Sequence, residues 1–170
     1  MTNYFSLFNI PEKFSIDLIE LKARYQTLQK LTHPDRFVNA SDQEKRMYMQ
    51  KNTQINDAYF VLSASVKRGE HILDIRGFKR VDEQATHSDN SFLMQQMMLR
   101  EQLSEATDEV SFNALEDEVT TLTNDLLDKV RNGLDSHNEA GHRAAADALT
   151  KLKFLAKLGE ESLARKEQIL

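Results

Sequence analysis

The sequence predicts an all-α protein with a helical hairpin in residues 1–76, a linker over residues 77–90 and a three-helix bundle in residues 91–170. First, the 170 residues are rich in Leu, Glu, Lys, Gln and Ala and include only five Gly and two Pro, a composition that favours helices. Second, apolar residues recur at spacings of three and four. Third, this periodicity lapses from Gly77 to Asn90, where polar residues dominate, as is typical of a linker.

The two predicted units differ in charge. Residues 1–77 carry 11 basic and 9 acidic side chains, and residues 78–170 carry 11 and 18, so their net charges are +2 and −7. Such a split indicates two modules with different partners. Neither unit is basic enough to suggest nucleic-acid binding.

Composition also limits the class of protein. The chain has no cysteine, which excludes disulfides and thiolate metal sites. No stretch approaches the ~18 consecutive apolar residues that suggest a membrane span, and the start, MTNYFSLFNIPEKFS, lacks the pattern of a targeting peptide. We therefore expect a cytoplasmic protein with no membrane partner.

The first unit begins with a short apolar turn, NYFSLF, which Pro11 prevents from continuing. Ser15 or Asp17 can cap the next helix. That helix should end near His33, because Pro34 disfavours the α conformation in the residue before it. Its apolar face is spaced by three and four and includes Leu18, Leu21, Tyr25 and Leu28.

A second long helix follows a polar stretch, RFVNASDQEK, and is expected to be capped near Ser41. Its inner side carries Ile55, Ala58, Tyr59 and Leu62. Two helices joined in this way form an antiparallel hairpin, with His33, Pro34 and Asp35 at its tip. A shorter helix over VKRGEHILDI completes the unit.

The tripeptide at the tip suits a binding loop. Pro34 fixes φ and removes a backbone donor, Asp35 supplies a carboxylate, and His33 supplies a switchable donor or acceptor. A rigid loop loses less entropy when it docks. Taken alone, however, the same residues also suit a capping turn in which Asp35 accepts backbone N–H groups.

The first helix of the second unit, within SFLMQQMMLREQLSE, has two apolar faces. One carries Phe92, Leu99 and Leu103 and can pack inward. The other carries Leu93, Met94, Met97 and Met98, with Glu101 and Glu105 among them. This second stripe is either additional core or an adaptable protein-binding surface of flexible Met side chains rimmed by carboxylates. Periodicity leaves both interpretations open.

Two further helices complete the bundle. The segment VSFNALEDEVTTLTNDLLDKVRNGL has an almost unbroken three-four pattern of Phe112, Leu115, Val119, Leu122, Leu126 and Val130. After Gly133 and the polar DSHNEAGH, a last helix is expected from about Arg143, with Phe154 pointing away from an inward face of Ala145, Ala148, Leu152 and Leu155. Short connections between three helices predict an antiparallel bundle.

ARYQTLQKLTHPDRF, followed downstream by INDAYFVLS, resembles a J domain, the module that stimulates ATP hydrolysis by DnaK-type chaperones. The resemblance implies that His33, Pro34 and Asp35 contact the ATPase. It also implies that a neighbouring patch meets an acidic surface of that partner, through Lys22, Arg24, Tyr25, Lys30 and Arg36. Gln26 departs from the pattern, because many J domains are basic there.

With FLMQQMMLRE and a last helix containing KLKFLAKLG, the whole chain is similar to the HscB family of J-type co-chaperones of iron–sulfur cluster assembly. This resemblance implies that the J domain engages an HscA-like ATPase and that the bundle binds an IscU-type scaffold protein. The implied scaffold-binding residues are Leu93, Met94, Met97, Met98, Glu101, Glu105 and Phe154. Met98 replaces an acidic residue of a relative.

Other functions are less consistent with the sequence. The nearest alternative is a general J-domain co-chaperone that delivers unfolded clients. An enzyme that pairs His33 with Asp35 would lack a pocket, a nucleophile and a cofactor loop. A metal site at His137 and His142 would lack helical spacing and any cysteine ligand. We therefore expect no catalysis, no cofactor and no metal.

Overall fold

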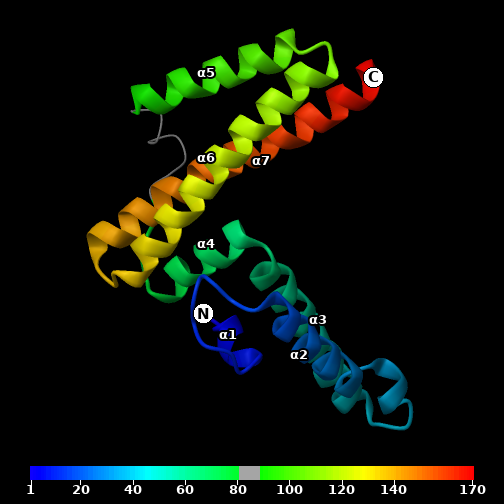
Figure 1. Cartoon of the computed structure of the whole chain (residues 1–170). Helices are drawn as coiled ribbons and strands as arrows, with labels where there is room; N and C mark the ends of the chain where they lie inside the picture. Colours follow the sequence, from blue (N-terminus) through cyan, green and yellow to red (C-terminus); the bar gives the residue numbers. More distant parts are fainter. Residues whose placement is uncertain (81–88) are drawn as a thin grey trace. The chain divides into compact units, whose positions relative to one another are not determined.

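The computed structural model describes residues 1–80 and 89–170, which divide into two compact units, Met1–Gly77 and Phe78–Leu170. Every regular element in these residues is a helix, so the predicted all-α class is confirmed (Figure 1). The predicted linker falls largely on residues 81–88, outside the described residues, and the predicted domain boundaries stay predictions. None of the described helices is long and apolar enough to cross a membrane.

The first unit consists of four α-helices and one 3-10 turn. In order, these are α1 (Tyr4–Leu7), α2 (Leu18–Leu31), η1 (Pro34–Phe37), α3 (Asp42–Ser63) and α4 (Ser65–Ile75). Helices α2 and α3 form an antiparallel hairpin with η1 at its far end, and α1 and α4 also contact α3 (Figure 1). The predicted hairpin and its tip are therefore present.

The ends of the two long helices follow from their caps. Of the two candidate caps of α2, Asp17 is the one used, because its carboxylate accepts from the backbone N of Ile19 at 2.9 Å. Ser41 caps α3 as predicted, and its hydroxyl and Glu44 form a reciprocal capping box. Helix α2 ends at Leu31, two residues before His33.

A buried arginine of α4 joins the segment before α2 to the end of α3. The guanidinium of Arg68 donates from Nε to the carbonyl oxygen of Phe14 at 2.6 Å and from a terminal nitrogen to that of Leu62 at 2.7 Å. Burial lowers the pKa of Arg68 from its ordinary value. The surrounding core is mainly apolar and includes Phe5, Phe8, Leu21, Ile55, Ala58, Leu62, Ile72 and Leu73.

The second unit contains α5 (Asn90–Glu105), α6 (Glu109–Asp135) and α7 (Glu139–Ile169). Helices α6 and α7 pack antiparallel along their length (Figure 1). Near one end of α5, the carboxylate of Asp89 binds Lys151 of α7, and near the other, Arg165 donates to the carbonyl oxygen of Ser104 at 2.9 Å. Helix α5 therefore runs parallel to the second half of α7.

Helix α7 begins at Glu139, four residues before the predicted start near Arg143. The side chain of Asn138 caps it by accepting from the backbone N of Gly141 at 2.7 Å. Periodicity missed this first turn because its one apolar side chain is the small, exposed Ala140. The predicted inward residues Ala145, Ala148, Leu152 and Leu155 are buried.

Helices α6 and α7 approach each other closely at two glycines, Gly133 and Gly141. A Cβ added to Gly133 would lie 2.5 Å from the carbonyl oxygen of Gly141, and one added to Gly141 would collide with the backbone of Gly133. We expect Gly141→Ala to lower the free energy of unfolding by about 1–3 kcal/mol, because backbone atoms must move apart. Urea denaturation measures this change.

The matched control is Gly159→Ala on the same helix, where an added Cβ meets nothing within 4 Å. This control should raise the free energy of unfolding by about 0.5–1 kcal/mol through helix propensity. Equal stability of the two variants would contradict the close approach at the hairpin end.

Candidate functional site

The hairpin tip is a capped turn with exposed side chains. His33 is the N-cap of η1, and its Nδ1 accepts from the backbone N of Asp35 at 3.3 Å. The neutral imidazole therefore carries its proton on Nε2. The side chains of His33 and Asp35 are 55% and 88% exposed. The carboxylate of Asp35 lies 3.5 Å from the same Nδ1 and is otherwise open to solvent.

A ladder of polar side chains between α2 and α3 supports the tip. Asn52 donates to the hydroxyl of Thr32 at 3.0 Å, and Asn56 donates to the amide oxygen of Asn52 at 3.1 Å. The hydroxyl of Tyr25 donates to Asn56 at 2.7 Å and accepts from Gln29 at 3.2 Å. Thr32, immediately before the tip, is thus linked to the middle of the hairpin.

Two aromatic pairs hold the same elements together. The ring of Tyr25 stacks on Tyr59 with centroids 4.1 Å apart, and Phe37 of η1 stacks on Tyr48 of α3 at 3.6 Å. The first pair joins the middle of α2 to α3, and the second joins η1 to α3 directly after the His33–Asp35 turn, which restricts the conformations of the tip.

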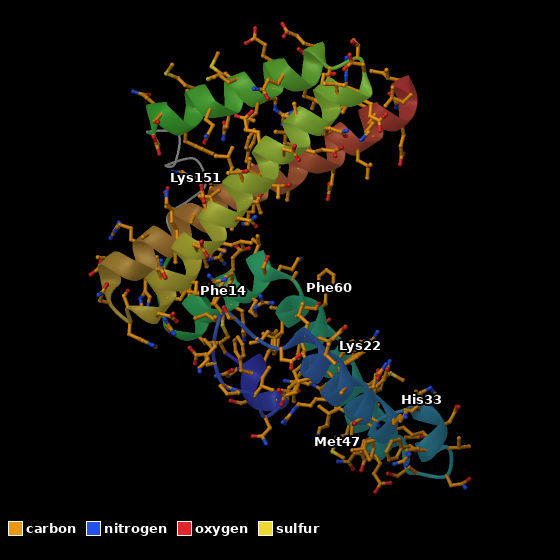
Figure 2. The ribbon with its side chains drawn as sticks, viewed as in Figure 1. Phe14, Lys22, His33, Met47, Phe60 and Lys151 are labelled. Atoms are coloured by element: carbon orange, nitrogen blue, oxygen red, sulfur yellow. The ribbon has the colours of Figure 1, made fainter. Side chains whose placement is uncertain are left out.

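Three predicted basic residues lie along α2 and at the tip. Lys22 and Lys30 are exposed on α2, and Lys30, Arg36, His33 and Gln29 line an open hollow at its end. Figure 2 shows Lys22 on α2 and His33 at the hairpin tip beyond the end of that helix. These side chains provide a cationic row that leads to the tip.

Two other predicted residues, Arg24 and Tyr25, have partners of their own within the first unit. Arg24 lies about 200° around α2 from Lys22, and its guanidinium donates to the carbonyl oxygens of Phe8 and Asn9 at 3.1 and 3.0 Å and to Glu20 at 2.8 Å. Tyr25 is occupied in the polar ladder. Both side chains therefore have partners within the first unit. Arg24 lies away from the exposed cations, whereas Tyr25, three residues after Lys22, neighbours that lysine on the helix surface.

The second group of predicted residues lies on α5. Leu93, Met94, Met97 and Met98 are 41%, 64%, 65% and 59% exposed, whereas Leu99 and Leu103 on the opposite face are buried. Glu101 and Glu105 are also exposed. We call the exposed set, Leu93, Met94, Met97 and Met98, the apolar stripe. Contiguous exposed apolar side chains indicate an interaction surface.

Phe154 of α7 lies next to α5. Its ring meets Phe92 edge-on with centroids 5.8 Å apart, and the guanidinium of Arg100 lies 5.5 Å from its centre. Arg100 is held by an ion pair with Glu161. Phe154 is half-buried, so it is absent from the inward face, as periodicity predicts, but it is anchored at the edge of α5.

The start of α5 is bound to α7 by an ionic cluster. The ammonium of Lys151 lies 3.1 Å from carboxylate oxygens of both Asp89 and Asp147 and 5.2 Å from the ring centre of Phe92. Burial opposes the charge of Lys151, but hydrogen bonds to Asp147 and Asp89 raise its pKa above the ordinary value. A backbone hydrogen bond from Phe92 and the bond from Lys151 lower the pKa of Asp89.

The sequence interpretation missed the residues that support both sites. Asn52 and Asn56 are four apart on α3, which was a signal for one polar face, but their partners on α2 depend on the hairpin register. The pairing of Asp89 with Lys151 spans 62 residues and has no local signal.

The described residues contain no group of three or more His, Cys, Asp or Glu side chains able to hold a metal ion. His137 lies in the α6–α7 connection with φ 50°, and His142 packs against Phe78 with ring centroids 5.8 Å apart. Neither histidine belongs to a group of three or more ligating side chains within the described residues.

Comparison with known proteins gives consistent matches. The family model described as the HSCB C-terminal oligomerisation domain matches residues 88–162. Co-chaperone protein HscB homologs from Pseudoalteromonas atlantica and Colwellia psychrerythraea are 45% and 44% identical over 163 residues, covering 94% of this chain and 93% of each relative.

Solved structures agree over nearly the full length. The chaperone HscB from Vibrio cholerae matches with a TM-score of 0.87 and 36% identity, covering 99% of this chain and 100% of that one. The human co-chaperone protein HscB matches with a TM-score of 0.90 and 30% identity, covering 98% of this chain and 83% of that one.

Proposed function

The chain belongs to the HscB family of co-chaperones, and from this membership we propose that it delivers an IscU-type iron–sulfur scaffold protein to an HscA-like, DnaK-type ATPase and stimulates ATP hydrolysis by that ATPase. The observation that carries the proposal is the presence of two different exposed surfaces, one in each compact unit. We place this activity in the cytoplasm and assign no catalytic step to the chain itself.

The hairpin tip is the proposed ATPase contact. Pro34 stiffens the turn, Nε2 of His33 can donate a hydrogen bond, and the carboxylate of Asp35 can accept one. Lys22, Lys30 and Arg36 complement an acidic partner surface and would speed its association. The polar ladder supports this role because it holds the tip ready for docking.

The apolar stripe and Phe154 are the proposed scaffold contact. Side chains of Met adapt to irregular partner surfaces, and Leu93 and Phe154 add stiffer anchors. Glu101 and Glu105 border this surface and can pair with cations of the scaffold. Met98 adds apolar area where the family resemblance implies an acidic residue, so we expect fewer polar contacts there.

Tethering explains how the two contacts act together. When one chain holds both partners, the second binding event becomes intramolecular, with an effective concentration set by the connecting segment. Weak contacts on each side can then form a productive ternary complex. The direct test measures ATPase stimulation with purified HscA-like and IscU-type partners, separately and together. Additive rates with no gain from the combination would contradict delivery.

A second candidate function is delivery of unfolded clients, which the exposed Met side chains favour because they can repack around different sequences. A titration against a folded scaffold and the same scaffold after denaturation separates the two functions. We expect the folded form to bind more tightly. Preference for the denatured form would favour the general co-chaperone.

The charge of the α2 row provides a further prediction. Lys22→Glu should weaken ATPase docking several-fold at low salt and reduce its salt dependence, because an attractive charge becomes repulsive. Lys129→Glu on α6, an exposed lysine in the other unit, is the matched control and should stimulate like wild type. Stimulation by Lys22→Glu that matches wild type at low salt would show that this row is not used.

A further inference from the structure

The first half of α5 has little apolar anchorage. Within its 16 residues only Leu99 and Leu103 are buried, whereas six residues are buried in α6 and seven in α7. Nothing from Asn90 to Met98 is fully buried, although this segment carries the whole apolar stripe. Apart from the half-buried Phe92, the position of the stripe must therefore depend on polar contacts at the surface of the bundle.

The ionic cluster of Lys151 supplies those contacts. One oxygen of Asp89 accepts from the backbone N of Phe92 at 3.2 Å and caps α5, while its other oxygen accepts from the ammonium of Lys151 at 3.1 Å. The same carboxylate thus begins the helix and binds it to α7. Lys151 projects from α7 towards the start of α5 (Figure 2) and also pairs with Asp147 on its own helix.

This cluster is continuous with Phe154. The ammonium of Lys151 lies over the ring of Phe92, and Phe92 meets Phe154 edge-on. The side chain of Lys151 is only 18% exposed, so it is largely covered and offers a partner little surface. Its contacts determine how the start of α5 lies against the part of α7 that carries Phe154.

We propose that Lys151 is a positioning residue for scaffold binding, which holds the first turns of α5 on α7 so that Leu93, Met97 and Phe154 form one continuous docking surface. This role rests on the proposed function, in which the scaffold binds that surface. Fixing the surface before binding reduces the ordering cost of the complex. Loss of the ammonium would leave the carboxylates of Asp89 and Asp147 facing each other, so α5 would move away or fluctuate.

The test replaces the ammonium while keeping the stem. Lys151→Met should weaken binding of the purified IscU-type scaffold about tenfold by calorimetry, and amides of residues 90–98 should exchange hydrogen faster than in wild type. Amides inside α6 and α7 should be unchanged. Lys151→Arg, which can still pair with both carboxylates, should restore binding and slow exchange. Lys129→Met, an exposed lysine on α6, is the matched control and should resemble wild type.

Several results would overturn this role. Wild-type affinity of Lys151→Met would do so, as would unchanged exchange in residues 90–98 or failure of Lys151→Arg to restore both measurements. Faster exchange throughout α6 and α7 would show a general structural role instead. Failure of the wild-type protein to bind the scaffold would overturn the proposed function. Hydrogen exchange does not depend on the scaffold, so unchanged exchange of the α5 amides in Lys151→Met would refute the positioning role even in that case.

Discussion

His33→Gln is expected to abolish stimulation of the HscA-like ATPase, reducing the stimulated rate at least tenfold towards the basal rate. The variant loses the imidazole that the hairpin tip presents to solvent. Its fold should persist, because the side chain is more than half exposed and a Gln oxygen can still accept from the backbone N of Asp35. A single-turnover ATPase assay at increasing concentrations of the variant measures the effect.

Two controls define this result. Thermal melting and scaffold titration of His33→Gln should match wild type, since the tip and the apolar stripe lie in different units. His137→Asn removes an imidazole from the second unit at a left-handed position that Asn tolerates, and should stimulate normally. Full stimulation by His33→Gln would refute the proposed ATPase contact.

Leu93→Ala combined with Met97→Ala is expected to weaken scaffold binding by about 10²–10⁴-fold, because each truncation removes an apolar anchor worth roughly 1–3 kcal/mol in the complex. Folding stability should change little, since both side chains are exposed in the free protein. Calorimetric titration with the scaffold and a thermal melt measure the two quantities. ATPase stimulation without scaffold should be unchanged.

The matched control truncates two exposed apolar residues elsewhere in the same unit, Val110→Ala with Leu163→Ala. Leu163 is nine residues from Phe154, about half a turn round α7, so it lies away from the proposed surface. Wild-type binding is expected from this control. A large drop in melting temperature for Leu93→Ala with Met97→Ala would show that the stripe is core, and unchanged affinity would refute the scaffold contact.

Much of the fold could be predicted because its signals are local. Spacing by three and four identified the buried residues of α3 and α7. Ser41 was correctly predicted as the N-cap of α3. The predicted start of α7 was four residues too late, because the first turn of the helix shows no apolar periodicity. Helix ends of this kind depend on capping geometry more than on composition.

The candidate sites were less predictable because exposure depends on tertiary packing. Periodicity separated the two faces of α5, but it could not decide which remained at the surface. The basic patch was assigned by resemblance, and nothing local to Arg24 indicates that its guanidinium is engaged by carbonyl oxygens of the preceding loop. Pairings such as Asp89 with Lys151 require the packed bundle and leave no mark in the local sequence.

The polar ladder between α2 and α3 also determines how the hairpin is aligned. Attraction between apolar side chains has no preferred direction. Two helices that meet only through apolar faces can therefore slide past each other by one turn at a small cost in free energy. Hydrogen bonds from Asn52 to Thr32 and from Tyr25 to Asn56 are directional, and sliding by one turn would break them together. The ladder therefore selects a single alignment, much as one buried asparagine selects register in a coiled coil. In that alignment, the His33–Asp35 turn always lies at the same height above α3.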